Sequence, residues 1–233
     1  MTHQTILILD FGSQYTQLIA RRVRELSVYC EILPCTTSMD VIRAKKPVGL
    51  ILSGGPAALT DPDAPNAPEG HWSFEGPILG VCYGMQLMAR DLGGAVARAD
   101  KREYGYARVA VDGSSPLFKG VACADPLECG TDVWMSHGVH VAAVPPGFRV
   151  IGKTDNCAVA AMESDSGKRF GLQFHPEVSH TKEGMTVLEN FVYGVLGCTK
   201  DWTNESFIGE AVERIRAQVG DQGVILGLSG GVD

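Results

Sequence analysis

Residues 77–86 read Pro-Ile-Leu-Gly-Val-Cys-Tyr-Gly-Met-Gln. Residues 77–81 form an apolar run that predicts a short buried strand, and residues 85–92 predict a helix. Cys82 lies at the joint, with a glycine two residues to either side, as a sharp strand-to-helix turn requires. The turn would hold the sulfur above the helix N-terminus, whose dipole favours a thiolate. The stretch therefore predicts a cysteine nucleophile that attacks an acyl carbon.

The sequence around this turn alternates between strand and helix patterns. Apolar runs at 5–10, 30–33 and 48–52 predict strands, and residues 14–26 and 39–45 predict helices. This order is typical of a mostly parallel sheet with helices on both faces, an α/β fold of three layers. Because active sites lie at the carboxyl ends of parallel strands, Asp10, Gly54 and Cys82 are expected at one edge.

The second half of the chain has a different pattern. Strand patterns at 106–111, 150–153, 158–162 and 169–173, with no long helix between them, predict a smaller antiparallel β region, and residues 181–196 predict a closing helix. We expect a first domain at 1–197, a linker at 198–204 and the start of a second domain at 205–233. In that last part, residues 205–219 predict a helix and 223–228 a strand.

Composition excludes several classes of protein. The 233 residues carry a net charge of −7, which argues against a general nucleic-acid surface. The arginines at 21, 22 and 24 are interpreted as a solvated helix face. No apolar run approaches the length of a membrane span, and the N-terminus lacks the basic region of a signal peptide. The seven cysteines form no C-x-x-C pair, so we expect no disulfide framework or metal site, and reduced thiols in the cytoplasm.

A cysteine nucleophile needs a base, and the base needs an orienting group. The segment Phe174-His175-Pro176-Glu177 offers both, because alternate side chains of an extended segment point the same way. Each feature also has a plainer interpretation: a buried cysteine is more often core, and Ser53-Gly54-Gly55-Pro56 is equally well a simple turn. The functional interpretation of the segment 53–56 is that it supplies one backbone N–H of an oxyanion hole, and the N–H of Tyr83 supplies the other.

Three segments together resemble the triad-type glutamine amidotransferases, which have a flavodoxin-like glutaminase fold. They are residues 52–56 (LSGGP), 80–86 (GVCYGMQ) and 173–177 (QFHPE). The resemblance implies hydrolysis of L-glutamine to glutamate and ammonia without a cofactor. It also implies Cys82 as nucleophile, His175 as base and Glu177 as its partner, with Gly55 and Tyr83 as oxyanion donors and Gln86 as a substrate contact.

A fourth segment, Trp134 to Gly138, resembles the Met-Ser-His-Gly-Asp segment of that family. The resemblance implies that Ser136, His137 and Gly138 contact the substrate's α-carboxylate through their backbone. Val139 stands where an aspartate is usual, so a charge contact from that position is absent here.

The end of the chain resembles the start of an ATP pyrophosphatase domain. Its loop would be Ser229, Gly230, Gly231, Val232 and Asp233, whose N–H groups would cradle a pyrophosphate. The resemblance implies a two-domain homodimeric enzyme that uses ATP, magnesium and xanthosine monophosphate (XMP) in its second domain. Since this chain holds only the beginning of that domain, we expect glutamine hydrolysis at most from this polypeptide.

Two alternatives remain. One is a γ-glutamyl hydrolase or cysteine peptidase of the same fold, although some related peptidases place a histidine where Tyr83 stands. The other is a non-catalytic docking module, which Val139 favours and the complete set of Cys82, His175 and Glu177 opposes.

Overall fold

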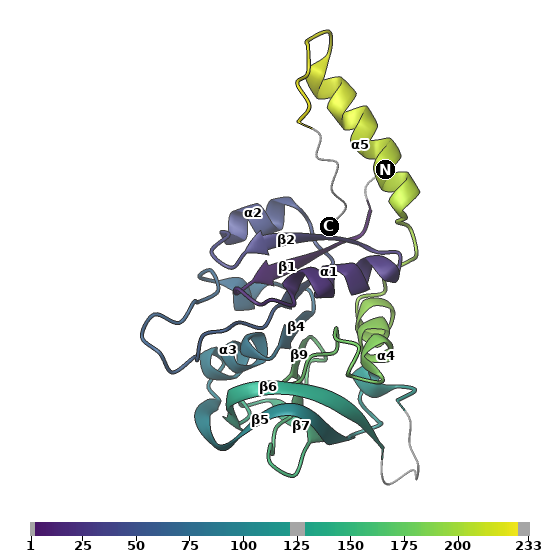
Figure 1. Ribbon diagram of the computed structural model, residues 1–233. Helices are drawn as coiled ribbons and strands as arrows, with labels where there is room; N and C mark the ends of the chain where they lie inside the picture. The colour runs from purple at the N-terminus through teal and green to yellow at the C-terminus, as the bar shows by residue number, and fades with distance from the viewer. Residues whose placement is uncertain (1–2, 122–128, 228–233) are drawn as a thin grey trace. The chain divides into compact units, whose positions relative to one another are not determined.

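The computed structural model describes residues 3–121 and 129–227. Contacts divide the chain into a large unit, Met1–Asp201, and a small one, Trp202–Asp233. The division falls inside the segment predicted as a linker. Within the described residues of the large unit, nine strands form one sheet in the order β2-β1-β3-β4-β9-β8-β7-β5-β6 (Figure 1). The strands are β1 (Thr5–Asp10), β2 (Tyr29–Pro34), β3 (Gly49–Leu52), β4 (Ile78–Val81), β5 (Ala95–Val111), β6 (Gly130–Ala143), β7 (Phe148–Lys153), β8 (Ala161–Ser164) and β9 (Arg169–Leu172).

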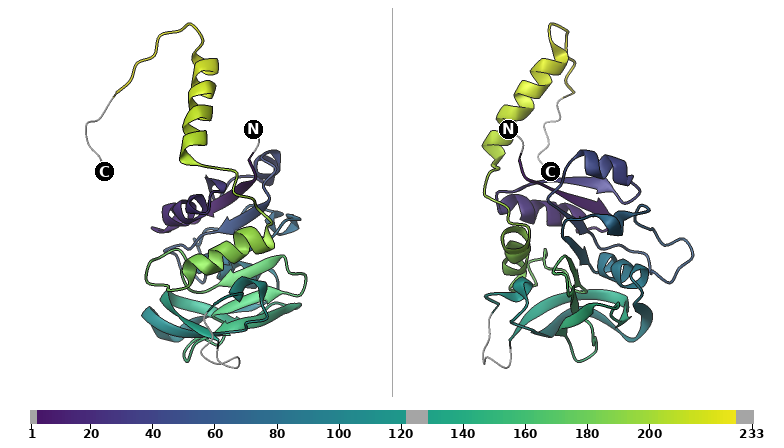
Figure 2. Two further views of the ribbon diagram at one scale, coloured as in Figure 1. Left: turned by 90° about the vertical axis from the view of Figure 1, so that its right-hand side faces the viewer. Right: turned by 180° about the vertical axis from the view of Figure 1, so that it is seen from behind.

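The sheet has a parallel half and an antiparallel half. Strands β2, β1, β3, β4 and β9 pair in parallel. From β9 onward, β8, β7, β5 and β6 pair antiparallel. The predicted α/β class is therefore confirmed, and β8 joins the antiparallel strands directly to β9 within the same sheet. In Figure 2 the β1–β2 edge lies at one end of the sheet and the β5–β6 ribbon at the other.

Helices cover both faces of the parallel half, as the continuous apolar strands require. Apolar residues of α1 and α4 pack in one core, and those of α2 and α3 pack in the other. The helical segments are α1 (Thr16–Glu25), α2 (Met39–Ala44), α3 (Tyr83–Asp91), α4 (Gly184–Glu189) and α5 (Asn204–Val219), with the short turns η1 (His71–Ser73) and η2 (Pro116–Phe118) and the π-helical η3 (Asn190–Val195).

Several predicted elements differ from the structure. Strand β6 was not predicted, and β5 begins at Ala95 rather than near residue 106. Strand β6 alternates buried and part-exposed residues. This alternation is hard to recognise in the sequence, because polar residues and loops interrupt the pattern of apolar residues. The predicted helix at 181–196 consists of α4 followed by the π-helical η3. Gly184 opens α4 where a Cβ would lie 2.0 Å from the carbonyl oxygen of Pro176.

The small unit contains α5, whose start is fixed by a capping box. The Thr203 side chain accepts from the N–H of Ser206, and the Ser206 side chain accepts from the N–H of Thr203. The strand predicted at 223–228 is absent from the described residues 223–227. In this described part, no neighbouring strand pairs with the segment, and Ile225 is fully exposed. The predicted ATP-binding loop at 229–233 lies outside the described residues.

The structure also bears on the expectations about membrane-spanning helices and about the cysteines. Among the described residues, no helix is both long enough and apolar enough to cross a bilayer. Cys30, Cys35, Cys82, Cys157 and Cys198 are free thiols. Cys129 is disulfide-bonded, so the expectation of reduced thiols is wrong at this position. Sequence spacing did not reveal this bond, because disulfides depend on the distance between residues in the fold.

Candidate active site

Cys82 lies in a strained turn between β4 and α3. Its φ is +50°, a conformation that side chains other than glycine rarely adopt. A Cβ on Gly80 would lie 2.6 Å from the backbone of Gly84, and a Cβ on Gly84 would lie 2.5 Å from the carbonyl oxygen of Leu52. The two glycines therefore allow the strand and helix to meet closely, as predicted.

The sulfur of Cys82 lies where several segments converge. The N–H of Cys82 donates to the Leu172 carbonyl of β9 at 2.7 Å, which ties the turn to the neighbouring strand. The sulfur is 3.8 Å from the Ser136 carbonyl oxygen of β6. A Cβ on Gly54 would lie 3.1 Å from the His175 ring and 3.7 Å from the Cys82 Cβ. The bare glycine at position 54 thus leaves the space in which ring and thiol meet.

His175 and Glu177 form a buried pair after β9. Their Nδ1 and Oε1 atoms are 2.8 Å apart, and both side chains are almost fully buried. The segment is a turn rather than the extended strand we predicted, and the two side chains meet across Pro176. The backbone is fixed because the hydroxyl of Thr181 donates to the His175 carbonyl at 2.6 Å.

Electrostatics favour a charged imidazole at this position. Burial alone lowers the pKa of His175, but the interactions with the Cys82 sulfur and the Glu177 carboxylate outweigh it and raise the pKa to about 10. A ring held charged beside a thiol stabilises the thiolate form of that thiol. The buried pair therefore places a charged imidazole beside the candidate nucleophile.

Two residues of the N-terminal segment complete the surroundings of the pair. The Tyr15 ring packs edge-on against the His175 ring, with centroids 5.1 Å apart. Arg22 donates from Nε to the Glu177 carbonyl oxygen at 2.9 Å. The prediction that Arg22 belongs to a purely solvated face is wrong, because α1 passes beside the turn that carries Glu177.

Gly55, Cys82 and Tyr83 line the same cavity, of about 510 Å³. Tyr83 is the first residue of α3, and the first N–H groups of a helix have no partner inside it. Gly55 must be a glycine because a Cβ there would lie 2.9 Å from the Phe11 carbonyl oxygen. Both predicted oxyanion donors are therefore at the cavity that holds the sulfur.

The other predicted substrate contacts line the same cavity. They are Gln86, Ser136, His137 and Gly138. Gln86 is buried, and its amide nitrogen donates to the Val139 carbonyl at 2.7 Å. The backbone of Val139 is thus used by Gln86, while its side chain, in the place of the usual aspartate, adds no charge to the wall.

Gln173 is a residue whose contact with the sulfur we did not predict. It is fully buried at the end of β9, its amide nitrogen lies 3.6 Å from the Cys82 sulfur, and its amide oxygen accepts from Gln86. The sequence offered one signal, because Gln173 directly precedes the segment that carries His175 and follows a strand expected beside the Cys82 strand.

Comparisons with known proteins agree with this geometry. The family model "Glutamine amidotransferase class-I" matches residues 7–195. The chain is 56% identical over 230 residues to "GMP synthase [glutamine-hydrolyzing]" of Vibrio vulnificus and 55% identical to that of Vibrio cholerae. These alignments cover 99% of this chain and 43% of each relative, so the chain spans less than half the length of these relatives.

Solved structures give the same answer for the fold. A putative GMP synthase protein of Thermoplasma acidophilum matches with a TM-score of 0.70 and 28% identity, over 90% of this chain and 99% of that one. A glutamine amidotransferase of Thermotoga maritima matches with a TM-score of 0.58 at 18% identity, over 94% of each chain, and supports the fold alone. With a family match across the sheet, the turn at Cys82 and the His175 segment, the chain belongs to the class-I glutamine amidotransferases.

Proposed function

We propose that this chain hydrolyses the side-chain amide of L-glutamine, with Cys82 as nucleophile, His175 as general acid and base, and Glu177 as the group that orients His175. The observation that carries the proposal is the strained Cys82 beside the buried His175–Glu177 pair, whose Nδ1–Oε1 distance is 2.8 Å. No cofactor is needed for this reaction.

The proposed reaction has two halves. The Cys82 thiolate attacks the amide carbon, and the carbonyl oxygen becomes an oxyanion that the N–H groups of Gly55 and Tyr83 stabilise. When the tetrahedral intermediate collapses, His175 donates its proton to the leaving nitrogen, and ammonia departs from a glutamyl thioester. His175 then removes a proton from water, which attacks the thioester and releases glutamate and the Cys82 thiolate.

The substrate contacts follow from the same cavity. Glutamine would lie between the Cys82 turn and the β6 segment Ser136–Gly138, whose backbone would hold the α-carboxylate. Gln86 would fix that segment through its bond to the Val139 carbonyl. This arrangement is supported by the position of all these residues on one cavity wall.

For the protein of which this chain can form a part, we propose the role of GMP synthetase. The support is the identity to relatives named GMP synthase, of which the chain spans 43%. In that role a synthetase domain would use ATP and magnesium to activate XMP, and ammonia from glutamine would aminate it. A homodimer and a cytoplasmic location belong to the same proposal. Five free thiols among the described residues fit a reducing compartment, whereas the bonded Cys129 does not.

The test is glutamine hydrolysis by Cys82→Ala, measured as glutamate release, with Cys30→Ala as the matched control. Cys30 is equally free and buried, and burial raises the pKa of its thiol to about 11. We expect Cys82→Ala to lose at least about a thousandfold in kcat and Cys30→Ala to keep its activity. Turnover retained in Cys82→Ala would reject Cys82 as the nucleophile.

A comparison of two substrates distinguishes the proposed glutaminase from the alternative, a γ-glutamyl hydrolase. A γ-glutamyl hydrolase would cleave γ-glutamyl peptides in preference to glutamine, whereas we expect glutamine to be preferred. If neither substrate is cleaved by the chain alone, the assay is repeated with a separate synthetase domain, XMP and ATP. If no hydrolysis is measured under either condition, the non-catalytic docking module is favoured.

A further inference from the structure

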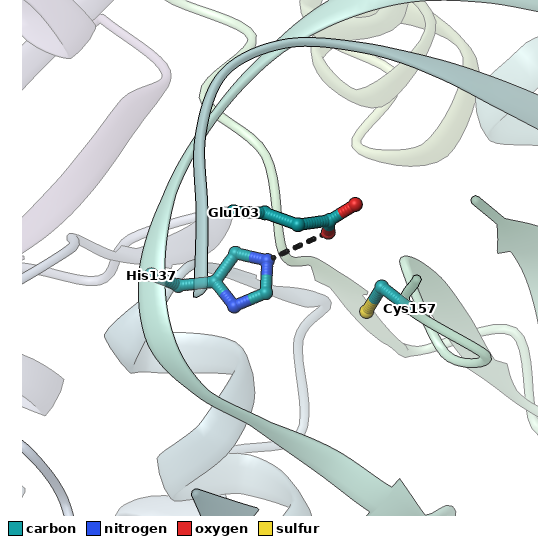
Figure 3. Close-up of side chains that lie close together, drawn as sticks. All are labelled: Glu103, His137 and Cys157. Atoms are coloured by element: carbon teal, nitrogen blue, oxygen red, sulfur yellow. Dashed lines mark hydrogen bonds and ion pairs between the residues drawn. The ribbon is translucent and has the colours of Figure 1, made fainter. Parts of the chain in front are cut away.

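A second cluster of reactive side chains lies in the antiparallel half of the sheet. Figure 3 shows Glu103 of β5, His137 of β6 and Cys157 of the loop between β7 and β8 pointing toward one another. One ligand atom from each lies within 4.8 Å of the other two, and all three residues are buried. The proposed hydrolysis does not use Glu103 or Cys157.

The three groups form a donor set suited to zinc. Carboxylate oxygen, imidazole nitrogen and thiolate sulfur are the three ligand types that zinc takes in proteins. A carboxylate and a thiolate together balance the two charges of the ion, so the occupied site would bury no net charge.

Neighbouring contacts already orient these ligands. Nε2 of His137 lies 3.1 Å from one Glu103 oxygen, and the Thr154 hydroxyl donates to the other at 3.0 Å. The Thr154 hydroxyl also accepts from the N–H of Cys157 at 2.9 Å, so it links the loop of the thiol to the carboxylate. The contacts of Thr154 are outer contacts of the kind that hold the ligands of metal sites in orientation, whereas the contact between His137 and Glu103 joins two of the ligands themselves.

Of the three ligands, Glu103 also lines a cavity of about 370 Å³, together with Thr154, Asp155, Asn156 and Arg108. Asp155 attracts a cation at this wall, and Arg108 repels it. Ligand atoms around zinc lie about 3.3 to 3.7 Å apart at bond lengths of about 2.0 to 2.3 Å, so ligand atoms at the 4.8 Å limit of the cluster would have to approach by about 1.1 to 1.5 Å.

We propose that Glu103, His137 and Cys157 bind a divalent zinc-like ion through one atom each, with a fourth position left to water. On binding, the Cys157 thiol forms a bond from sulfur to the metal and releases its proton to solvent. His137 also belongs to the β6 segment on the Cys82 cavity, so the ion would stiffen that wall.

The experiment measures cobalt(II) binding by the untagged chain in a Cys82→Ala background, which removes the other thiol that stands beside a histidine. Cobalt(II) replaces zinc as a coloured probe, and its bond to a thiolate gives a charge-transfer absorption band. We expect the band at one equivalent of Co²⁺. It should require at least tenfold more metal when Cys157→Ala is added and remain unchanged when Cys30→Ala is added instead.

A second variant keeps the test independent of damage to the loop. Glu103→Gln keeps the shape of the side chain, and it should weaken Co²⁺ binding at least tenfold while the band, once formed, keeps its thiolate character. The proposal is overturned if no band forms in the Cys82→Ala chain, or if the band persists at the same metal concentration without Cys157. Since all these chains lack the candidate nucleophile, the outcome is separate from that of the glutaminase assay.

Discussion

The two halves of the sheet contribute different things to the candidate site. The parallel half carries Cys82, Gly55 and His175 on turns that directly follow strands β4, β3 and β9. The antiparallel half supplies a wall, Ser136–Gly138, from the middle of a long strand that pairs with β5. Reactive groups thus come from short turns that follow strands, one of them strained at Cys82, whereas the binding wall depends on pairing between segments far apart in sequence.

The largest expected effect tests the parallel half. His175→Asn removes the group that would move the proton, while an amide keeps part of the ring's shape and polarity. We expect kcat for glutamine hydrolysis to fall about a thousandfold, with the Tm changed far less. An enzyme that keeps more than about a tenth of its kcat would place the proton transfer on another group.

The close contact beneath Cys82 gives the next effect. In Gly84→Ala the new Cβ would lie 2.5 Å from the Leu52 carbonyl oxygen, so strand and helix must separate. We expect a loss of about 3 kcal/mol in unfolding free energy, measured with urea, and a lower rate of thiol alkylation. Gly194→Ala is the control, because nothing lies within 4 Å of its Cβ position. Equal stability of the two variants would contradict the tight turn.

The raised pKa of His175 predicts a dependence of stability on pH. The folded ring keeps its proton up to about pH 10, whereas the unfolded ring loses it near its ordinary value of 6.5. The stabilisation is therefore complete below pH 6.5 and is lost as the pH rises toward 10. Relative to His175→Asn, the unfolding free energy should decrease by at most about 1.4 kcal/mol per pH unit across this window. Parallel curves for the two chains would contradict the charged ring.

The smallest effect tests the antiparallel half. Glu103→Gln weakens the support of His137, so the wall of the glutamine cavity loses order without loss of a reacting group. We expect KM for glutamine to rise about threefold and kcat to stay within about twofold. The control is Glu163→Gln, a buried carboxylate of β8 bonded to Ser115 and Arg149 rather than to the cavity wall. A large fall in kcat for Glu103→Gln alone would give this half a direct part in the chemistry.

The same contrast explains what the sequence could predict. The glycines around Cys82, the strand ends and the pairing of His175 with Glu177 are encoded within a few residues, and their close approach is confirmed. The full length of β5 and β6, the contact of Gln173 with the sulfur and the role of Arg22 depend on long-range packing. The cluster of Glu103, His137 and Cys157 joins three segments that are distant in sequence, so the spacing of residues along the chain could not predict it.

The most direct test of the central claim is alkylation by a chloroketone analogue of glutamine, followed by peptide mapping. If Cys82 beside His175 is the nucleophile of a site that binds glutamine, the analogue should react at Cys82 alone, and excess glutamine should protect it. The buried thiols of Cys30 and Cys157, whose pKa values are raised to about 11, should stay unlabelled in the folded chain. Labelling spread over several cysteines, or labelling at Cys82 that glutamine does not slow, would contradict the account.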